Sequence, residues 1–127
     1  MVFLGAGLGG LFRFLLSTNA QKFAAGLSGS VSFVFPVGTF LVNMIGCFLI
    51  GFIAQMAETR AFLQGDTRLF LTVGILGGFT TFSSFGYETM ALIRDGEMLL
   101  ALGNAAGQLI LGLFFVWLGM VIGKLLV

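Results

Sequence analysis

The amino-acid sequence predicts an all-α membrane protein with four transmembrane helices in each subunit. The first observation behind this prediction is composition, because 58% of the 127 residues are hydrophobic and only 9% are charged. Soluble domains carry roughly 25% charged residues. The second observation is that apolar segments recur near the length of about 20 residues that a helix needs to cross a bilayer.

Four segments are long and apolar enough to span the membrane. A polar linker with Asn19, Gln21 and Lys22 follows the first, and a tight turn at residues 94–97 joins the third to the fourth. The linkers are too short to hold an extramembrane domain, so we expect one four-helix transmembrane domain over residues 1–127 in the cell (inner) membrane. The expected spans are approximately Val2–Ser17, Val34–Met56, Leu69–Ile93 and Met98–Leu126.

Composition also excludes several classes of function. The net charge is only +1, so the sequence gives no sign of the basic face that a nucleic-acid partner would need. The chain has no His and one Cys, Cys47, which excludes the usual zinc, haem and iron–sulfur ligand sets. No nucleophile–base pair is apparent, so we do not expect an enzyme.

Charge gives almost no preferred orientation. Four spans place both termini on one side of the membrane, together with Arg60, Arg68 and Lys124. Lys22 and Arg94 lie on the other side, which also gains Arg13 if its side chain extends that way. A bias of Lys and Arg between loops normally sets topology, and here the tally is close to even. Two interpretations stay open: a small bias that fixes one orientation, or dual topology in which two copies pair antiparallel.

The 20 glycines indicate close helix packing. "GAGLGG" at residues 5–10 also matches a dinucleotide-binding fingerprint, but that motif needs a preceding strand and an acid about 20 residues later. The first acid in the chain is Glu58, so we interpret these glycines as packing residues. Packing inside one subunit and packing in a dimer are both compatible with the pairs spaced by four, which are Gly5/Gly9, Gly74/Gly78, Gly103/Gly107 and Gly119/Gly123.

Polar residues at membrane depth are the candidate functional groups, because each is costly in lipid unless it faces protein or water. Glu88 is either functional or a paired structural carboxylate, and Arg13 is either a functional cation or a packing residue or interfacial anchor. The full set is Arg13, Thr39, Asn43, Thr80, Thr81, Ser83, Ser84, Glu88, Thr89, Asn104 and Gln108.

The stretch "GGFTTFSSF", residues 77–85, predicts a break near the middle of the third helix. Its two glycines weaken the helix, and Thr and Ser can divert backbone hydrogen bonds. We expect Phe82 and Phe85 to share a face that Phe79 continues, beside a polar line of Thr81, Ser84 and Glu88. Freed carbonyls at a break suit a hard cation, while hydroxyls, amides and aromatic ring edges suit a small anion.

The sequence resembles the Fluc (CrcB) fluoride channel family over nearly its whole length. The resemblance rests on "GGFTTFSSF" with Glu88 following, on "GTFLVNMIGCFLIG" at residues 38–51, and on "GLGGLFRF" at residues 7–14. It implies an antiparallel, dual-topology homodimer with two pores that exports fluoride passively. The chain departs from the family pattern at Gln108, near which Ser or Asn is more usual.

The resemblance also implies roles for individual residues. Phe82 and Phe85 would point ring edges at fluoride, and Asn43 would donate to the ion. Backbone carbonyls of Gly77 and Thr80 from both subunits would hold a central structural Na⁺. The remaining residues expected along the fluoride pathway are Thr81, Ser83, Ser84, Glu88, Asn104 and Gln108.

Two other functions remain as alternatives. A proton-coupled exporter of the small multidrug-resistance type would use a membrane carboxylate, for which Glu88 is the candidate, although that family has its glutamate in the first helix. A non-transporting assembly subunit would explain the glycines but not the clustered hydroxyls and phenylalanines.

Overall fold

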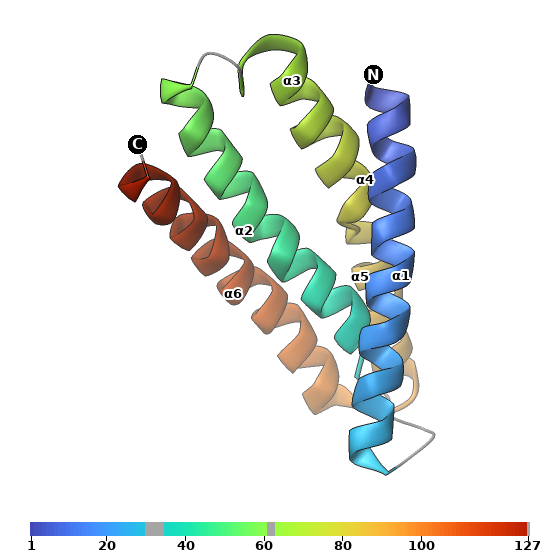
Figure 1. Ribbon diagram of the computed structural model, residues 1–127. Coiled ribbons are helices and arrows are strands. Elements are labelled where there is room, and N and C mark those ends of the chain that lie inside the picture. Colours follow the sequence, from blue (N-terminus) through green and yellow to red (C-terminus); the bar gives the residue numbers. More distant parts are fainter. Residues whose placement is uncertain (30–34, 61–62, 127) are drawn as a thin grey trace.

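The computed structural model describes residues 1–29, 35–60 and 63–126 and is helical over most of them (Figure 1). Within this part of the chain, four helical segments are long and apolar enough to cross a membrane. The chain is therefore a multi-pass membrane protein. The segments are α1 (Val2–Ser28), α2 (Val37–Thr59), a composite third span over Gly65–Arg94, and α6 (Met98–Leu125).

The third span consists of four pieces. It starts as α3 (Gly65–Leu69), widens into a π-helix (Phe70–Leu76), and returns to one short turn, α4 (Gly77–Phe79). Thr80 and Thr81 are extended, with φ/ψ of −82°/158° and −150°/115°. The helix resumes as α5 (Phe82–Arg94). The predicted break therefore exists, and Phe79 is the one residue between it and the glycine pair.

The first helix is longer than the sequence suggested. α1 continues through residues 18–28, which we had expected to be a linker. Polar side chains at its end bond to nearby backbone, since Asn19 Nδ2 donates to the Leu15 carbonyl at 2.7 Å and Gln21 Nε2 to the Phe35 carbonyl at 3.0 Å. The helix ends at Gly29, whose φ of 64° is the left-handed conformation that favours glycine. Val34, the expected start of the second span, lies outside the described residues.

The helices pack as two pairs, α2 with α6 and α1 with the first half of the third span (Figure 1). Glycines set the distance within each pair. A side chain at Gly9 would collide with the Ile75 carbonyl, and one at Gly119 would collide with the Phe48 carbonyl. Gly5/Gly9, Gly74/Gly78 and Gly119/Gly123 thus serve packing inside the subunit, whereas Gly103 faces open space.

The two pairs diverge toward the end of the molecule that holds both termini and the α2–α3 connection (Figure 1). At the other end they converge, and α1 contacts α2 while α5 contacts α6. Between α5 and α6 the predicted tight turn is present: Glu97 N–H donates to the Leu92 carbonyl at 2.8 Å, and Gly96 has a φ of 81°.

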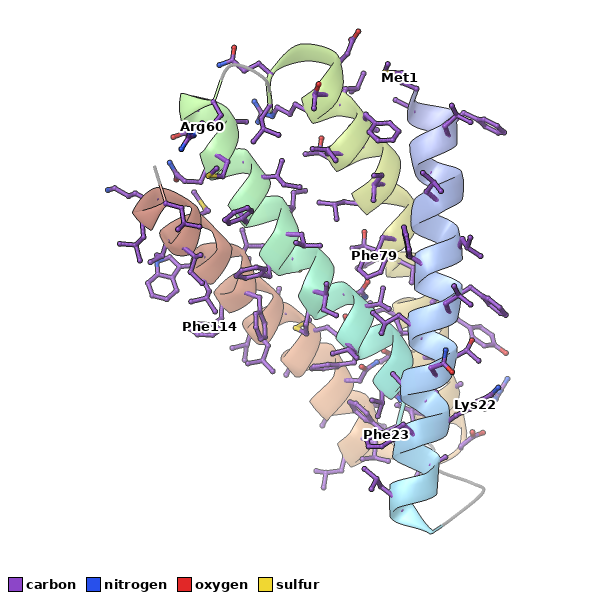
Figure 2. All side chains as sticks on the ribbon, in the orientation of Figure 1. Met1, Lys22, Phe23, Arg60, Phe79 and Phe114 are labelled. Atoms are coloured by element: carbon purple, nitrogen blue, oxygen red, sulfur yellow. The ribbon has the colours of Figure 1, made fainter. Side chains whose placement is uncertain are left out.

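A cluster of buried core residues, Val42, Leu76 and Phe79, lies where the pairs meet. Most other large hydrophobic side chains point outward, including Phe3 and Phe114, the latter labelled on α6 in Figure 2. In water so much exposed apolar surface would be unfavourable, but lipid solvates it. Lys22 lies at the opposite end of the molecule from Met1 and Arg60, as the four-span topology predicts (Figure 2).

Candidate functional site

Asn43 of α2 bridges the break in the third span. Its Oδ1 accepts a hydrogen bond from Thr81 N–H at 2.9 Å, and its Nδ2 donates to the Thr81 carbonyl at 3.1 Å. One amide side chain thereby satisfies both backbone groups of the extended residue. Since an unpaired backbone group at this depth would be costly, Asn43 explains how the break is tolerated.

At the break, two backbone carbonyls lose the N–H donors that they would have in a continuous helix. In a continuous helix Thr81 N–H would reach the Gly77 carbonyl and Ser84 N–H the Thr80 carbonyl. Instead, Thr81 N–H donates to Asn43 and Ser84 N–H donates to Thr81 Oγ1 at 3.2 Å. Gly77 and Thr80 are the two residues expected to ligate a cation, and carbonyl oxygens released from a helix are suitable ligands for a hard cation. These residues therefore fit the predicted Na⁺.

Thr81 is the N-cap of α5. Its hydroxyl accepts from Ser84 N–H and lies 3.0 Å from Ser84 Oγ and 3.4 Å from Ser83 Oγ. The three hydroxyls thus form one cluster at the start of α5, as the predicted polar line requires for Thr81 and Ser84.

Phe82 and Phe85 share a face, as predicted, with ring centroids 5.5 Å apart and planes inclined at 52°. Phe82 is 83% exposed on the isolated subunit. Phe79 does not continue their line, and that part of the prediction is wrong. The two extended residues reset the helical phase, so Phe79 is only 7% exposed and packs in the core.

A chain of amides connects α2, α6 and α5. Asn43 Nδ2 donates to Gln108 Oε1 at 2.9 Å, and Gln108 Nε2 donates to Asn104 Oδ1 at 3.4 Å. Asn104 Nδ2 then donates to Thr89 Oγ1 at 2.9 Å, and the Thr89 hydroxyl donates to the Phe85 carbonyl at 2.7 Å. The chain starts at Thr81 and returns to the helix that carries both phenylalanines, so it braces that helix.

Glu88 belongs to a separate polar group. Its Oε1 accepts from the Thr39 hydroxyl at 2.7 Å. Its Oε2 is buried and has no hydrogen-bond partner among the described residues. Both Thr39 and Glu88 line a hollow of about 490 Å³, with Ser17, Gln21 and Lys22 of α1 also on its wall. The carboxylate thus faces the end of the molecule where α1 and α2 converge.

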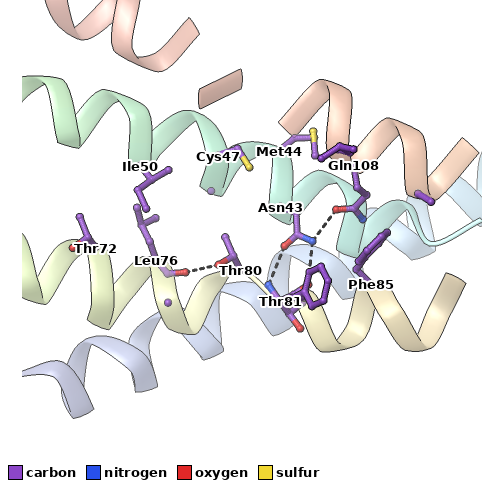
Figure 3. A pocket seen from close by; sticks show the side chains of 15 residues that line it. Asn43, Met44, Cys47, Ile50, Thr72, Leu76, Thr80, Thr81, Phe85 and Gln108 are labelled. Atoms are coloured by element: carbon purple, nitrogen blue, oxygen red, sulfur yellow. Dashed lines mark hydrogen bonds between the residues drawn. The ribbon is translucent and has the colours of Figure 1, made fainter. Parts of the chain in front are cut away.

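The largest set of predicted residues meets at one cavity of about 460 Å³ between α2, α6 and the third span (Figure 3). Apolar side chains, among them Met44, Cys47 and Leu76, form much of the remaining wall. No Lys, Arg, Asp or Glu is among its lining residues in the described chain. The predicted residues that line it are Asn43, Gly77, Thr80, Thr81, Phe82, Phe85 and Gln108.

The remaining predicted residues lie around this cavity. Asn104 is fully buried behind Gln108, Glu88 lines the second hollow, and Ser83 and Ser84 bond to Thr81. The sequence had singled out Thr39 and Thr89 as polar without assigning partners. Thr39 lies four residues before Asn43, and Thr89 lies four residues after Phe85. This helical spacing is the sequence feature that could have indicated their place beside the site.

Arg13 lies half-buried in α1 and makes no ion pair among the described residues, where the Arg94–Asp95 contact at 3.8 Å is the one salt bridge. It lines neither of the two cavities described above. The structure therefore gives no functional contact for Arg13.

Comparison with known proteins identifies the family to which this chain is similar. Residues 1–120 match the family described as CrcB-like protein, Camphor Resistance (CrcB). A protein of Thermus thermophilus is 47% identical over 127 residues, which cover all of this chain and 95% of the relative. Proteins of Parabacteroides distasonis and Prosthecochloris aestuarii are 44% and 40% identical, with 98% of this chain and 91% and 92% of the relatives covered.

Each of these three relatives is named a fluoride-specific ion channel, FluC. The names are those of an ion channel and not of an enzyme, in agreement with the expectation from sequence. Because the family match and the relatives span nearly the whole chain, this protein belongs to the CrcB family of membrane proteins.

Proposed function

We propose that the protein is a fluoride-selective channel that exports fluoride passively from the cytoplasm across the cell membrane. One observation carries the proposal: the cavity beside the helix break combines two phenylalanines with hydroxyl and amide groups and is free of charged side chains along its described lining. Aromatic ring edges carry partial positive charge. Such a wall can replace the water around a small anion without binding it as tightly as a ring of Lys or Arg.

The relatives' names support fluoride as the anion. Fluoride enters cells as the weak acid HF and ionises in a more alkaline cytoplasm, so a passive channel suffices to return it. In the proposed pathway the ion passes the ring edges of Phe82 and Phe85. The polar groups bordering it are those of Asn43, Thr81, Ser83, Ser84, Glu88, Asn104 and Gln108.

The proposed active unit is an antiparallel, dual-topology homodimer with two pores. Two features support it: the nearly balanced charge at the two ends of the molecule, and the exposure of Phe82 at the edge of the cavity. The carbonyls of Gly77 and Thr80 from both subunits would hold a central Na⁺, which supplies positive charge at the dimer interface. The loss of their helical donors supports this part of the proposal.

The test is efflux from liposomes that contain purified protein and are loaded with fluoride or chloride. A fluoride electrode should record fast, electrogenic fluoride release once a potassium ionophore provides the compensating charge, with almost no chloride release in the matched vesicles. Vesicles that release no fluoride, or release chloride as readily, would contradict the proposal.

Substitution of the phenylalanines tests the assigned pathway. Phe82→Ile and Phe85→Ile should each reduce fluoride release strongly, because an aliphatic side chain has no ring edge to offer the ion. Phe114→Ile, on the outer face of α6, is the matched control and should conduct like the unaltered protein. Unchanged release in both Phe82 and Phe85 variants would remove the proposed role of the rings.

The comparisons do not favour the alternative of a proton-coupled multidrug exporter, since the relatives carry the name of a channel. The same liposomes distinguish the two functions. A channel passes fluoride without a proton gradient, whereas an exporter exchanges organic cations for protons.

A further inference from the structure

Two sulfur-containing side chains line the cavity apart from its amides and hydroxyls. Met44 and Cys47 lie three residues apart on α2, a spacing that puts both side chains on one helix face. Both line the cavity of about 460 Å³, and Figure 3 shows them on its α2 wall. The pair therefore brings a thioether and a thiol to the same place.

The ends of the two side chains converge over Gly112 of α6. A Cβ atom at this glycine would lie 3.5 Å from Cys47 Sγ and 3.8 Å from Met44 Cε. Because glycine has no side chain, Met44 and Cys47 share this space with each other. Methionine turns about three side-chain bonds, so its sulfur can be directed toward the thiol.

Both sulfur atoms are available as ligands. Cys47 is a free thiol, since the chain has no second cysteine. Met44 is only 5% exposed, so little water competes for its thioether. Within the described chain, the cavity lining holds no Lys or Arg that would repel a cation.

This donor set suits a different class of ion from the helix break. Thiolate and thioether are soft ligands that select ions such as Cu⁺, whereas the carbonyl oxygens of Gly77 and Thr80 suit a hard ion such as Na⁺. Cu⁺ and its analogue Ag⁺ can be held by two sulfur ligands, whereas a structural Zn²⁺ takes four ligands. On binding, the S–H bond of Cys47 breaks, a sulfur–metal bond forms, and the proton passes to water with no change of oxidation state.

We propose that Met44 and Cys47 together bind one soft monovalent cation of the Cu⁺ class, and that the bound ion blocks the cavity to fluoride. A metal ion held on the α2 wall narrows the space that the proposed pathway crosses. The block rests on the proposed fluoride channel, whereas the binding of the metal does not.

Methionine methyl resonances test the binding directly, with silver nitrate as the probe. The buffer contains nitrate in place of chloride because silver chloride precipitates. Protein labelled with ¹³C in its methionine methyl groups gives six signals, and the one that vanishes in Met44→Leu belongs to Met44. One equivalent of silver should shift this signal in the unaltered protein and leave it in place in Cys47→Ala. A stationary Met44 signal in the unaltered protein would overturn the proposal.

Silver affinity separates a two-sulfur site from a single reactive thiol. In competition with glutathione, Met44→Leu should bind silver at least about tenfold more weakly than the unaltered protein. Met120→Leu, at a partly exposed position of α6, is the matched control and should bind silver like the unaltered protein. Equal affinity of Met44→Leu and the unaltered protein would contradict a role for Met44 as ligand.

Transport tests the block. In fluoride-loaded liposomes with nitrate in place of chloride, silver should stop fluoride release by the unaltered protein. Release by Cys47→Ala should be the same with silver as without it. Undiminished release by the unaltered protein at saturating silver would contradict the block. Absence of fluoride release before silver is added would instead contradict the proposed channel function, and the Met44 methyl signal would still decide whether the metal site exists.

Discussion

At the scale of single residues, the site depends on side chains that replace backbone hydrogen bonds. Asn43 satisfies both backbone groups of Thr81, and Thr81 in turn caps α5 through Ser84 N–H. The two replacements together release the carbonyls of Gly77 and Thr80 from their helical donors. A break of two residues is thereby stable at membrane depth and leaves acceptor oxygens at its edge.

The cap at Thr81 can be tested by removing its hydroxyl. Thr81→Val keeps the shape of the side chain but loses the acceptor for Ser84 N–H, so the free energy of unfolding should fall by about 1 kcal/mol. Thr81→Ser should restore most of it. Thermal unfolding in detergent, followed by circular dichroism, measures the difference. Ser83→Ala is the control, since Ser83 makes only a 3.4 Å contact with Thr81. Equal melting of Thr81→Val and the unaltered protein would show that the cap does not stabilise α5.

Residue-scale prediction succeeded where spacing was sufficient and failed where the backbone left its regular path. Thr39 and Asn43 face the third span together, and Asn104 and Gln108 bond to each other, as four-residue spacing indicates. Phe79 was misplaced because helical phase cannot be carried across the two extended residues after it. The hydrogen bond between Asn43 and Gln108 joins α2 to α6 through residues 65 positions apart in sequence. No local sequence pattern contains that contact.

At the scale of elements, glycine position decides which helix faces touch. The four-residue pairs predicted close packing, but the sequence could not tell packing within a subunit from packing in a dimer. The structure assigns Gly5, Gly9, Gly74 and Gly78 to the contact between α1 and the third span. The length of α1 and the π-helix before the break were both missed. Polar residues can end a helix or bond along it. The π-helix packs against α1, and no local pattern in the sequence contains that contact.

Two glycines of α1 offer a matched test of that contact. In Gly9→Ala the added methyl group meets the Ile75 carbonyl and the Phe79 nitrogen, so α1 must move away from the third span. In Gly7→Ala the methyl group meets no atom within 4 Å. We expect Gly9→Ala to destabilise the protein by roughly 1–3 kcal/mol, and Gly7→Ala to leave stability unchanged or raise it by up to about 1 kcal/mol through helix propensity. Thermal unfolding of both variants in one detergent compares them, and equal melting temperatures would contradict the packing.

At the scale of the whole molecule, the two ends carry similar charge. Arg60, Arg68 and Lys124 belong to the end with both termini, whereas Lys22 and Arg94 belong to the end where the pairs converge. This even distribution follows from the confirmed order of the four spans. It gives the membrane insertion machinery little basis for choosing one orientation, and so a few substitutions should be enough to fix it.

Orientation can be measured with one cysteine outside the membrane. In a Cys47→Ala background, Glu97→Cys places a thiol at the exposed α5–α6 turn. If insertion is dual, an impermeant maleimide should label about half of the protein in intact cells and all of it after permeabilisation. Uniform labelling of the starting protein in intact cells, or its uniform protection, would show a single orientation and contradict dual topology.

Charge substitutions extend the same measurement to the active unit. Adding Lys22→Gln and Arg94→Gln leaves cationic residues mainly at the end with the termini, so that end should become cytoplasmic and the thiol fully labelled. The opposite pair, Arg60→Gln and Lys124→Gln, should leave the thiol protected. If the active unit is an antiparallel dimer, each fixed variant should lose fluoride release when expressed alone, because its copies all point the same way. Co-expression of the two variants should restore release, whereas full activity of one fixed variant alone would contradict the antiparallel arrangement.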